Sequence, residues 1–570
     1  MTDTLVKPPQ QAGSTDSTAR RGILLVFAGL MVTMLLASLD QTIFSTALPT
    51  IVGDLHGVSL QLWVTTAYIL AETIVLPVYG KLGDLMGRKN IFIIAIAIFI
   101  LGSIVGGLAT NMGTLITGRA IEGLGGGGLM ILAQAIIADV VPARERGKYM
   151  GIMGGVFAFS SVAGPLLGGF FTDGIGWRWA FWMNVPLGLL AIASAVFFLK
   201  LPKREDQGKP KIDIWGMTLL AIASVSLVLA TTWGGNQYDW ISWQILGLFG
   251  VLVVAGVAFV LVERKTAEPV MPLHLFKEKN FVFTTAATLV IGIAMFGSIA
   301  YIPTYLQMVT GSNATQAGFL LIPMMAGLLV TSVISGQIVS KTGRYKFFPI
   351  VGMVITAGAL ALMSTMTSTT PIFVMCLYFA MMGVGLGLAM QILTLIVQNT
   401  FPLREVGTAT ASNNYFRQIG ASLGAAVVGS LFVSKLTGLL TDRLPASASS
   451  ATGSTNSLTP EIVKNLPAGI KSLVISSYAD ALTPIFLLMV PLVLLAAVLL
   501  FFVTEKPLAT TLDRSPVAES LATGSVPTVA MPADSAVASA TGGSGVAPAA
   551  GGSAVREARA ADADTVPSGS

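Results

Sequence analysis

Five charged side chains lie inside long apolar segments, where an ionised group is costly. These residues are Asp40, Glu72, Arg119, Glu122 and Arg417. A charged side chain at the centre of a bilayer costs about 2.5–3.5 kcal/mol on insertion scales, and such residues are normally retained for function. A carboxylate placed there can bind and release a proton or hold a cationic ligand. We therefore take these residues as candidates for a proton- and substrate-binding site.

Each candidate also has a structural interpretation. Asp40 and Glu72 can serve as partners in interhelical hydrogen bonds and nothing more. Arg119 and Glu122 are three positions apart, hence on one helical face, where they can neutralise each other as a local ion pair. Alternatively, Arg119 stabilises the deprotonated form of a nearby carboxylate until a proton or a substrate displaces it. That arrangement would couple the binding of proton and substrate.

The sequence offers little for other kinds of chemistry. It contains two histidines and one cysteine, Cys376, which excludes an H-E-x-x-H zinc site, a histidine relay within the membrane and an intramolecular disulfide. No Gly-Lys pair is followed by the Ser or Thr that a Walker A loop needs. We recognise no nucleophile–base set. We therefore expect no enzyme, no cofactor and no metal, with a proton gradient as the energy source.

Membrane-spanning helices must position the candidates. Of the 570 residues, 54% are hydrophobic and only 11% are charged, whereas soluble domains carry about 25% charged residues. Apolar runs of about 20 residues recur, and each must be helical because lipid offers the backbone no hydrogen-bond partner. We predict an all-α polytopic protein with about fourteen spans, near residues 22–46, 61–79, 90–109, 113–138, 148–171, 179–199, 214–232, 241–262, 281–306, 316–339, 347–366, 372–397, 408–432 and 483–503.

The cations set the predicted orientation. Every second loop between spans is basic, which explains the net charge of +5 better than a nucleic-acid surface does. Because basic loops stay in the cytoplasm, both termini are predicted to be cytoplasmic. The basic groups are Arg20 and Arg21; Lys81, Arg88 and Lys89; Arg144, Arg146 and Lys148; Lys200 to Lys211; Arg264 to Lys279; Lys341, Arg344 and Lys346; and Arg404.

A short charged loop appears twice. The segment from Gly80 to Lys89 is matched by the segment from Gly336 to Lys346. Gly80 and Gly336 are separated by the same number of residues as Arg88 and Arg344. A Pro-x-Arg-Glu-x-Gly pattern ending at Gly147 recurs with nearly the same spacing at Gly407. Two six-span halves with two inserted spans explain both matches. Such parallel halves are found in major facilitator transporters, where substrate binds between them.

The first copy of this loop has a mechanical interpretation. Gly80 and Gly87 permit a tight turn, and Asp84 can face a helix N-terminus or an arginine such as Arg88 or Arg144. These contacts would hold the cytoplasmic side shut in one state. Solvated positive charge is the alternative. In the second copy Ser340 replaces the acid, which predicts gating contacts that differ between the halves.

A second backbone feature lies in the fifth span. Gly164, Pro165, Gly168 and Gly169 follow a Gly-Gly pair at 154–155. Proline removes a helix hydrogen bond and glycine removes bulk, so we expect a kink and tight packing against a neighbour in the other half. Ordinary packing of small residues is the alternative.

The chain divides into five predicted parts. Residues 1–19 form a flexible cytoplasmic lead-in, 20–200 the first bundle, 201–279 the inserted spans with their loops, and 280–507 the second bundle with an external loop at 435–477. Residues 508–570 are rich in Ala, Gly, Ser and Pro, and they bury too little apolar area to order, so we predict a disordered cytoplasmic tail.

Several of these segments together resemble the fourteen-span drug:proton antiporters of the EmrB/QacA type, within the major facilitator superfamily. The resemblance covers about residues 20–506 and rests on Leu39 to Pro49, Gly80 to Lys89, Leu115 to Gly123, Gly164 to Gly169, Trp177 to Pro186, and Arg417 to Gly420. It implies that Asp40 and Arg119 belong to a proton-coupling region and that the Gly164-Pro165 segment is associated with export. Glu122 departs from the pattern, because the family usually has glutamine there.

We therefore expect a proton-coupled antiporter that exports hydrophobic, cationic compounds across a bacterial cytoplasmic membrane. Its partners would be a small hydrophobic substrate, protons and membrane lipid, with no nucleic acid. A dedicated exporter of a native lipid, secondary metabolite or antibiotic is the alternative, and a membrane receptor or scaffold that transports nothing is a further one. The oligomeric state is open, with a monomer favoured.

Overall fold

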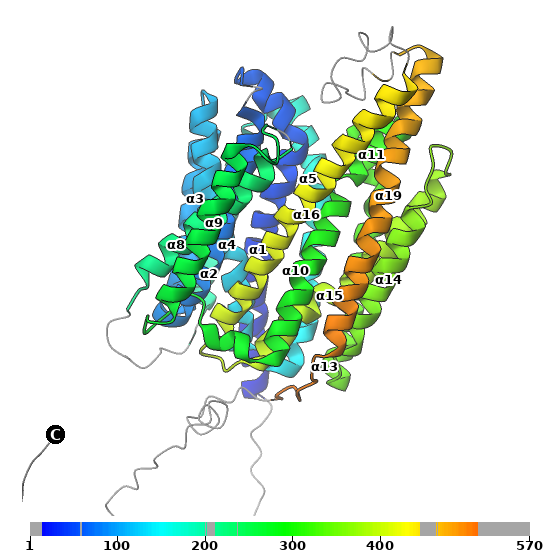
Figure 1. The fold of residues 1–570 in the computed structure, drawn as a ribbon. Coiled ribbons are helices and arrows are strands. Elements are labelled where there is room, and N and C mark those ends of the chain that lie inside the picture. Colours follow the sequence, from blue (N-terminus) through cyan, green and yellow to red (C-terminus); the bar gives the residue numbers. More distant parts are fainter. Residues whose placement is uncertain are drawn as a thin grey trace, which may run out of the picture.

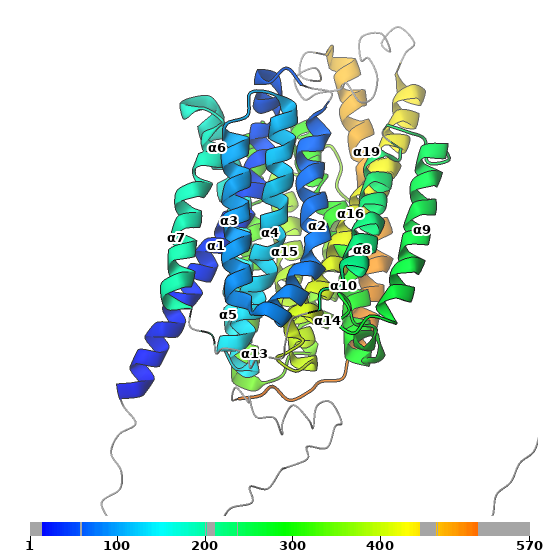
Figure 2. The same cartoon turned by 90° about the vertical axis from the view of Figure 1, so that its left-hand side faces the viewer.

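The computed structural model describes residues 14–57, 60–199, 201, 211–235, 237–444, 463 and 466–510. The long helices of this part run side by side through one bundle (Figures 1 and 2). Thirteen described helical segments are long and apolar enough to cross a membrane. The remaining expected span is the apolar helix α14 (Phe347–Met363), whose 17 residues lie at the lower limit for crossing. The predicted all-α polytopic fold is confirmed.

The first half of the chain supplies six spans, the last of them built from α6 and α7. Close packing pairs α3 with α4, α2 with α4 and α1 with α5. The helices are α1 (Ser14–Asp54), α2 (Gln61–Met86), α3 (Arg88–Gly107), α4 (Met112–Val140), α5 (Ala143–Phe170), the π-helical turn η2 (Phe171–Ile175), α6 (Trp179–Trp182) and α7 (Asn184–Phe198).

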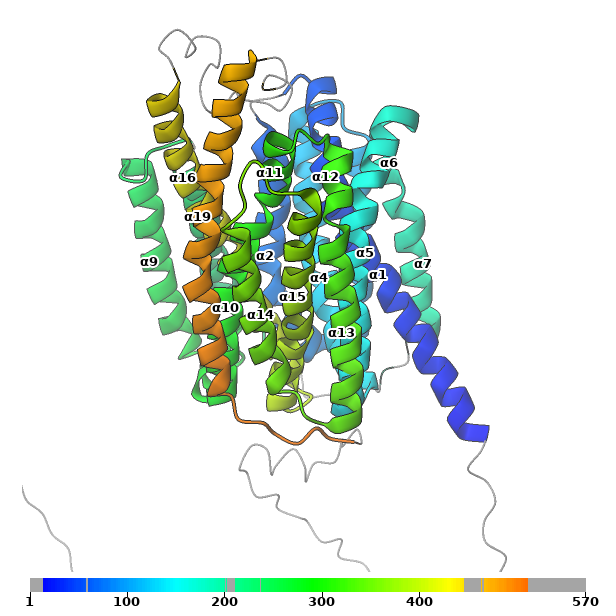
Figure 3. The ribbon, with the colours of Figure 1, turned by 90° about the vertical axis from the view of Figure 1, so that its right-hand side faces the viewer.

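The second half repeats this scheme around α15, which packs against both α13 and α14. Figure 3 shows these three helices on one side of the bundle, with α10 and α19 beside them. The helices are η3 (Leu273–Lys277), α10 (Lys279–Ile299), α11 (Ile302–Val309), α12 (Ala314–Leu320), α13 (Ile322–Thr342), α14, α15 (Ile372–Thr400), α16 (Val406–Arg443) and α19 (Ala468–Phe501).

The two inserted helices lie against the seam between the halves. α8 (Ile214–Trp233) contacts both α2 and α16, and α9 (Trp243–Glu263) packs on α8 at the edge of the bundle (Figure 2). The hydroxyls of Ser224 and Tyr415 are 2.8 Å apart, which ties α8 to the second half. The rings of Trp63 and Trp233, 5.9 Å between centroids, join it to the first. α8 therefore covers one side of the space between the halves.

We call the end of the bundle with the Arg88, Arg144 and Arg344 loops the basic end, and the opposite end the far end. At the basic end the segment after α19 runs across the bundle, and the carbonyl of Ala509 accepts a hydrogen bond from the backbone N–H of Arg144 at 3.0 Å (Figures 1 and 3). Residues 511–570, most of the predicted disordered tail, lie outside the described part.

Several helix ends lie beyond the predicted limits of their spans. α2 continues to Met86, so Gly80 lies within a helix and the turn expected there is made at Gly87 alone. α1 begins at Ser14, inside the segment expected to be flexible, and its first turns project from the basic end (Figures 2 and 3). α16 continues to Arg443 and α19 starts at Ala468, so both enter the predicted 435–477 loop. Arg443 pairs with Asp480 at 2.8 Å and joins the two extensions. Hydropathy misses such turns because a helix that has left the lipid no longer needs apolar side chains.

Candidate functional site

Arg119 holds two carboxylates inside the first half. Its Nη1 donates to Oδ2 of Asp40 at 2.6 Å and to Oε2 of Glu122 at 2.7 Å. Both acids are 0% exposed and the arginine 2%, so water does not screen these contacts. Arg119 therefore makes both the local pair with Glu122 and a contact with a carboxylate from another helix.

Two polar side chains outside the predicted set complete this group. Ser103 Oγ donates to Glu122 Oε1 at 2.5 Å, while Asn184 Nδ2 donates to Asp40 Oδ1 and to Ser103 Oγ, each at 3.0 Å. A Cβ on Gly102 would lie 2.3 Å from the backbone nitrogen of Glu122, so only glycine lets α3 approach α4 this closely. We call Asp40, Ser103, Arg119, Glu122 and Asn184 the Arg119 cluster.

Aromatic rings cover the guanidinium of the cluster. Arg119 Cζ lies 4.1 Å from the ring centroid of Phe44 and 4.2 Å from that of Tyr68. Cation–π attraction strengthens where water is excluded, as it is here. Phe44, Tyr68 and Arg119 also line the central cavity. The Arg119 cluster is thus buried, yet it borders a space that can hold a ligand.

The central cavity lies between the halves and has a volume of about 600 Å³. It extends from Leu76 and Gln134 near mid-bundle to Pro49 and Gln61 near the far end. More of the lining surface is apolar than polar, and the polar groups on it can fix the orientation of a small molecule. Both halves and α8 contribute, through residues that include Met34, Met130, Met153, Val228, Thr231, Phe296, Leu328, Met390, Gln391 and Gln418.

Two charged residues face this cavity outside the Arg119 cluster. Glu72 of α2 accepts a hydrogen bond from Gln41 Nε2 at 2.9 Å and is 6% exposed. Arg417 of α16 comes from the second half and is half-buried. The structure therefore brings Asp40, Arg119 and Glu122 together, and it places Glu72 and Arg417 separately on the cavity wall.

The loop from Gly80 to Lys89 joins the halves at the basic end. Asp84 Oδ2 accepts hydrogen bonds from the backbone nitrogen and Oγ1 of Thr408, at 2.6 and 2.8 Å, in the first turn of α16. Arg88 donates to Asp84 Oδ1 at 2.7 Å and to the carbonyl of Leu403 at 2.9 Å. A carboxylate at a helix N-terminus is stabilised by the helix dipole. Asp84 thus contacts both partners considered from the sequence, a helix N-terminus and Arg88.

The two loop glycines serve different purposes. Gly87 has a φ of 91°, which L side chains rarely adopt, and it separates α2 from α3. A Cβ on Gly80 would lie 2.8 Å from the carbonyl oxygen of Gly407, so this glycine permits α2 and α16 to touch. We call the contacts of Gly80, Asp84 and Arg88 with α16 the Asp84 latch.

The second copy of the loop joins the halves at the basic end through different contacts, between α13 and α5. Arg144 donates to the carbonyls of Ser340 at 3.1 Å and Lys341 at 2.7 Å, at the C-terminal end of α13. A Cβ on Gly336 would lie 2.1 Å from the carbonyl oxygen of Gly147, so α13 and α5 touch at paired glycines. The first copy joins the halves through the acid Asp84. The second copy has Ser340 at the corresponding position, and there Arg144 joins the halves by binding the C-terminal end of α13.

The glycines of the fifth span do not all pack as expected. Cβ atoms on Gly164 and Gly168 would lie 2.0 and 2.2 Å from Thr42 Oγ1 and Thr46 Oγ1 of α1, whereas Gly169 has open space around it. The segment around Pro165 therefore packs against α1 in its own half, and the expected contact with the other half is wrong there. The contact is made about three turns earlier, where Gly154 meets Ser332 of α13. The reason is that α5 crosses α13 with its basic half and α1 with its far half.

Comparisons with known proteins agree with this architecture. The sequence profile of the Major Facilitator Superfamily matches residues 30–425. An uncharacterised MFS-type transporter of Mycobacterium tuberculosis is 39% identical over 496 residues, covering 87% of this chain and 71% of that protein. The multidrug transporter protein MdtP of Bacillus subtilis is 37% identical over 487 residues, covering 81% and 89%.

A fungal relative and a solved structure extend the comparison. The acurin A biosynthesis cluster MFS-type transporter of Aspergillus aculeatus is 31% identical over 425 residues, with 73% of this chain and 76% of that protein covered. The structure of the human organic anion transporter MFSD10 superposes with a TM-score of 0.55 and 13% identity over 85% of this chain and 99% of the other, which indicates a shared fold alone. The chain belongs to the Major Facilitator Superfamily and is a multi-pass membrane transporter rather than an enzyme.

Proposed function

We propose that this transporter is a proton-coupled antiporter that exports hydrophobic, cationic compounds from the cytoplasm across a bacterial cytoplasmic membrane, working as a monomer. The observation that carries the proposal is the Arg119 cluster, in which two fully buried carboxylates share one guanidinium beside the cavity. The names of two Bacillus subtilis relatives, MdtP and Multidrug resistance protein 3, support a multidrug substrate range.

The charge balance of the cluster suits proton binding. Asp40, Glu122 and Arg119 together carry one excess negative charge when both acids are ionised. One proton makes the group neutral, and a net charge in a low-dielectric interior is expensive. A cationic ligand in the adjacent cavity would favour the deprotonated form. Binding of the ligand and release of the proton are then coupled, as antiport requires.

Glu72 is the proposed contact for the cationic part of the substrate. It is the carboxylate that faces the cavity from α2, and Gln41 holds one of its oxygens in place. Because Gln41 follows Asp40 on α1, a movement of α1 reaches both the Arg119 cluster and the Glu72 site. This adjacency supports a mechanism in which substrate and proton compete through the same helix.

The positions of the contacts suggest one step of an alternating-access cycle. The Asp84 latch and the Gly147–Gly336 contact hold the halves together at the basic end, and the cavity extends toward the far end. With the basic loops and both termini on the cytoplasmic side, the structure corresponds to a state closed to the cytoplasm. Among the described residues, thirteen candidate spans together with α14 support assignment to the fourteen-span EmrB/QacA branch.

A transport assay in proteoliposomes tests the proposal. Movement of a lipophilic cationic dye should follow an imposed proton gradient and stop when a protonophore collapses it. The variant Asp40→Asn/Glu72→Gln/Glu122→Gln should lose gradient-driven transport, whereas Asp480→Asn, which removes an exposed carboxylate, should retain it. Dye movement that ignores the gradient, or full transport by the triple variant, would refute proton coupling.

A dedicated exporter of a native lipid or secondary metabolite is the second candidate. The relative from the acurin A biosynthesis cluster favours it, because its name connects it with one natural product. Screening a small ligand panel separates the two: a single natural class accepted, with no dyes moved, supports the dedicated exporter.

A further inference from the structure

Among the described residues that line the cavity, Arg417 is the arginine contributed by the second half. Its only hydrogen bond recorded in the described part of the chain is from Nη2 to Met130 Sδ at 3.9 Å, which is a weak interaction. No carboxylate among the described residues lies within ion-pair distance of it. The guanidinium is therefore half-buried on the cavity wall and has no counter-ion within ion-pair distance among the described residues.

The other arginines inside or next to the spans are treated differently. Arg119 contacts two carboxylates, Arg88 contacts Asp84 and Asp139, and Arg146 donates to two backbone carbonyls. Each of these three guanidinium groups therefore donates to carboxylate or carbonyl oxygens of the protein. Arg417 is an exception located where a ligand would lie, and an unpaired charge in a membrane protein marks a site of function.

The surroundings of Arg417 exclude an internal partner in this state. Glu72 lies on α2, which packs against α16, and its charge acts on Arg417, but it is outside ion-pair distance and accepts a hydrogen bond from Gln41 instead. One turn before Arg417 on the same helix, Asn414 donates to Gln134 Oε1 at 3.3 Å, and Gln134 is uncharged. Nearby lining residues are apolar or neutral, such as Met130 and Met153. Of the charged groups that line the cavity, Arg119 is paired within its cluster, which leaves the acid Glu72 from the first half and the base Arg417 from the second.

We propose that Arg417 binds an anionic group of the transported compound, so that the favoured substrates are amphiphiles carrying a carboxylate or a similar acid in addition to a cationic part. This inference rests on the proposed export function and specifies the substrate class of the same cavity. The planar guanidinium presents several donors in a fork that matches a carboxylate. The cationic part lies toward Glu72, and the apolar body contacts the methionines and Phe44.

A matched pair of dyes isolates the contribution of the acid. Rhodamine B carries a cationic xanthene and a free carboxylate, and its ethyl ester has the same ring system without the negative charge. Binding of each dye to the purified protein in detergent is measured by fluorescence anisotropy, without any proton gradient. Since a hydrogen-bonded charge pair is worth about 1.5–3 kcal/mol, Arg417→Gln should weaken binding of the acid by about tenfold or more.

The same variant should change binding of the ester less than about threefold, because the ester offers no charge to the guanidinium. Arg417→Lys keeps the charge without the fork and should fall between wild type and Arg417→Gln. Arg404→Gln, which removes an exposed arginine outside the cavity, should leave the acid-to-ester ratio unchanged. Equal losses for both dyes, or no loss for either, would overturn the proposal.

The wild-type protein supplies a test that needs no variant. The acid should bind at least as tightly as the ester, and tighter binding of the ester would refute an anion site at Arg417. Transport distinguishes this inference from the proposed function. Binding selectivity that depends on Arg417 while dye movement ignores the proton gradient would remove the antiport proposal and leave the anion site intact.

Discussion

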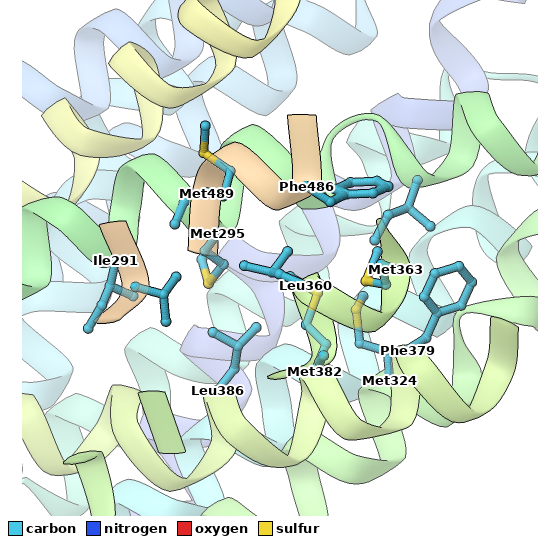
Figure 4. Packing of buried hydrophobic residues seen from close by; sticks show 14 of the residues in the cluster. Ile291, Met295, Met324, Leu360, Met363, Phe379, Met382, Leu386, Phe486 and Met489 are labelled. Carbon is cyan, nitrogen blue, oxygen red and sulfur yellow. The ribbon is translucent and has the colours of Figure 1, made fainter. Parts of the chain in front are cut away.

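The two halves of the molecule differ in what fills their centres. The first half contains the Arg119 cluster, with Glu72 nearby on α2. The interior of the second half is packed with methionine, leucine and phenylalanine, including Met324, Met363, Met382, Phe379 and Phe486 (Figure 4). Between Lys279 and Phe501, the described helices carry acids only at Asp442 and Asp480, both exposed.

This difference indicates how two related halves can divide the work. Buried acidic groups are concentrated in the first half, so in the proposed antiport cycle proton binding would change the charge of that half alone. Methionine is flexible and fills irregular space, which suits a half that repacks without changing its charge. The two seams at the basic end differ in the same sense, since the first has the carboxylate of Asp84 and the second a serine.

The largest effect is expected from Arg119→Gln. Removing the cation leaves two buried carboxylates without a positively charged partner, which costs about 3–5 kcal/mol of stability and should abolish coupled transport. Thermal unfolding in detergent and dye transport measure the two effects. The double variant Arg119→Gln/Glu122→Gln removes one unpaired acid and should recover part of the stability but no coupling. A single variant as stable as wild type would contradict the described ion pairs.

Gly336→Ala tests the seam that lacks an acid. The new Cβ would lie 2.1 Å from the carbonyl oxygen of Gly147, so the helices must separate at a cost of about 1–3 kcal/mol for the closed state. Spin-label distances between α5 and α13 at the basic end should lengthen. Gly169→Ala is the control, because its Cβ would meet nothing within 4 Å. Equal distance distributions in both variants would show that this seam does not govern closure.

Asp84→Asn tests the seam that has the acid. The neutral amide loses the charge-assisted bonds to Thr408 and Arg88, and we expect the closed state to lose about 2 kcal/mol. The label distance between α2 and α16 reports the change. Ser340→Asp adds an acid beside Arg144 and should act in the opposite direction on the other seam. If Ser340→Asp also opened the basic end, the explanation that an acid stabilises contact between the halves there would be wrong.

The smallest effect is expected from Met382→Leu in the second half. The substitution nearly conserves volume and removes no charge, so the free energy of unfolding should change by less than about 1.5 kcal/mol. Transport and its dependence on the proton gradient should be unchanged. A loss of coupling here would show that the methionine-rich interior takes part in proton handling.

Much of this architecture was predictable from the sequence. Hydropathy placed the spans because lipid forces each crossing segment to be apolar and helical. The high cost of charge in the membrane identified Asp40, Glu72, Arg119, Glu122 and Arg417 as candidates. Ser103 and Asn184 gave no comparable signal, since a neutral polar group in an apolar helix is cheap enough to be common.

The pairing of these groups depends on helix crossings. Two acids share Arg119 because α1 and α4 meet at that level, while Glu72 and Arg417 face a cavity that exists only between assembled halves. The direction of the Pro165 segment, toward α1 rather than the other half, depends on the angle at which α5 passes its neighbours. Local patterns do not contain that angle, because it results from packing among residues far apart in the chain.

The composition and the repeated loop were enough to establish a two-half helical transporter and the residues whose charge needs explaining. The three-dimensional arrangement established which charges neutralise one another and which remain available to a ligand. The physical reason is that the free energy of transferring a segment into lipid depends on the residues of that segment alone. The partner of a buried charge, in contrast, is set by helices that meet only in the folded protein.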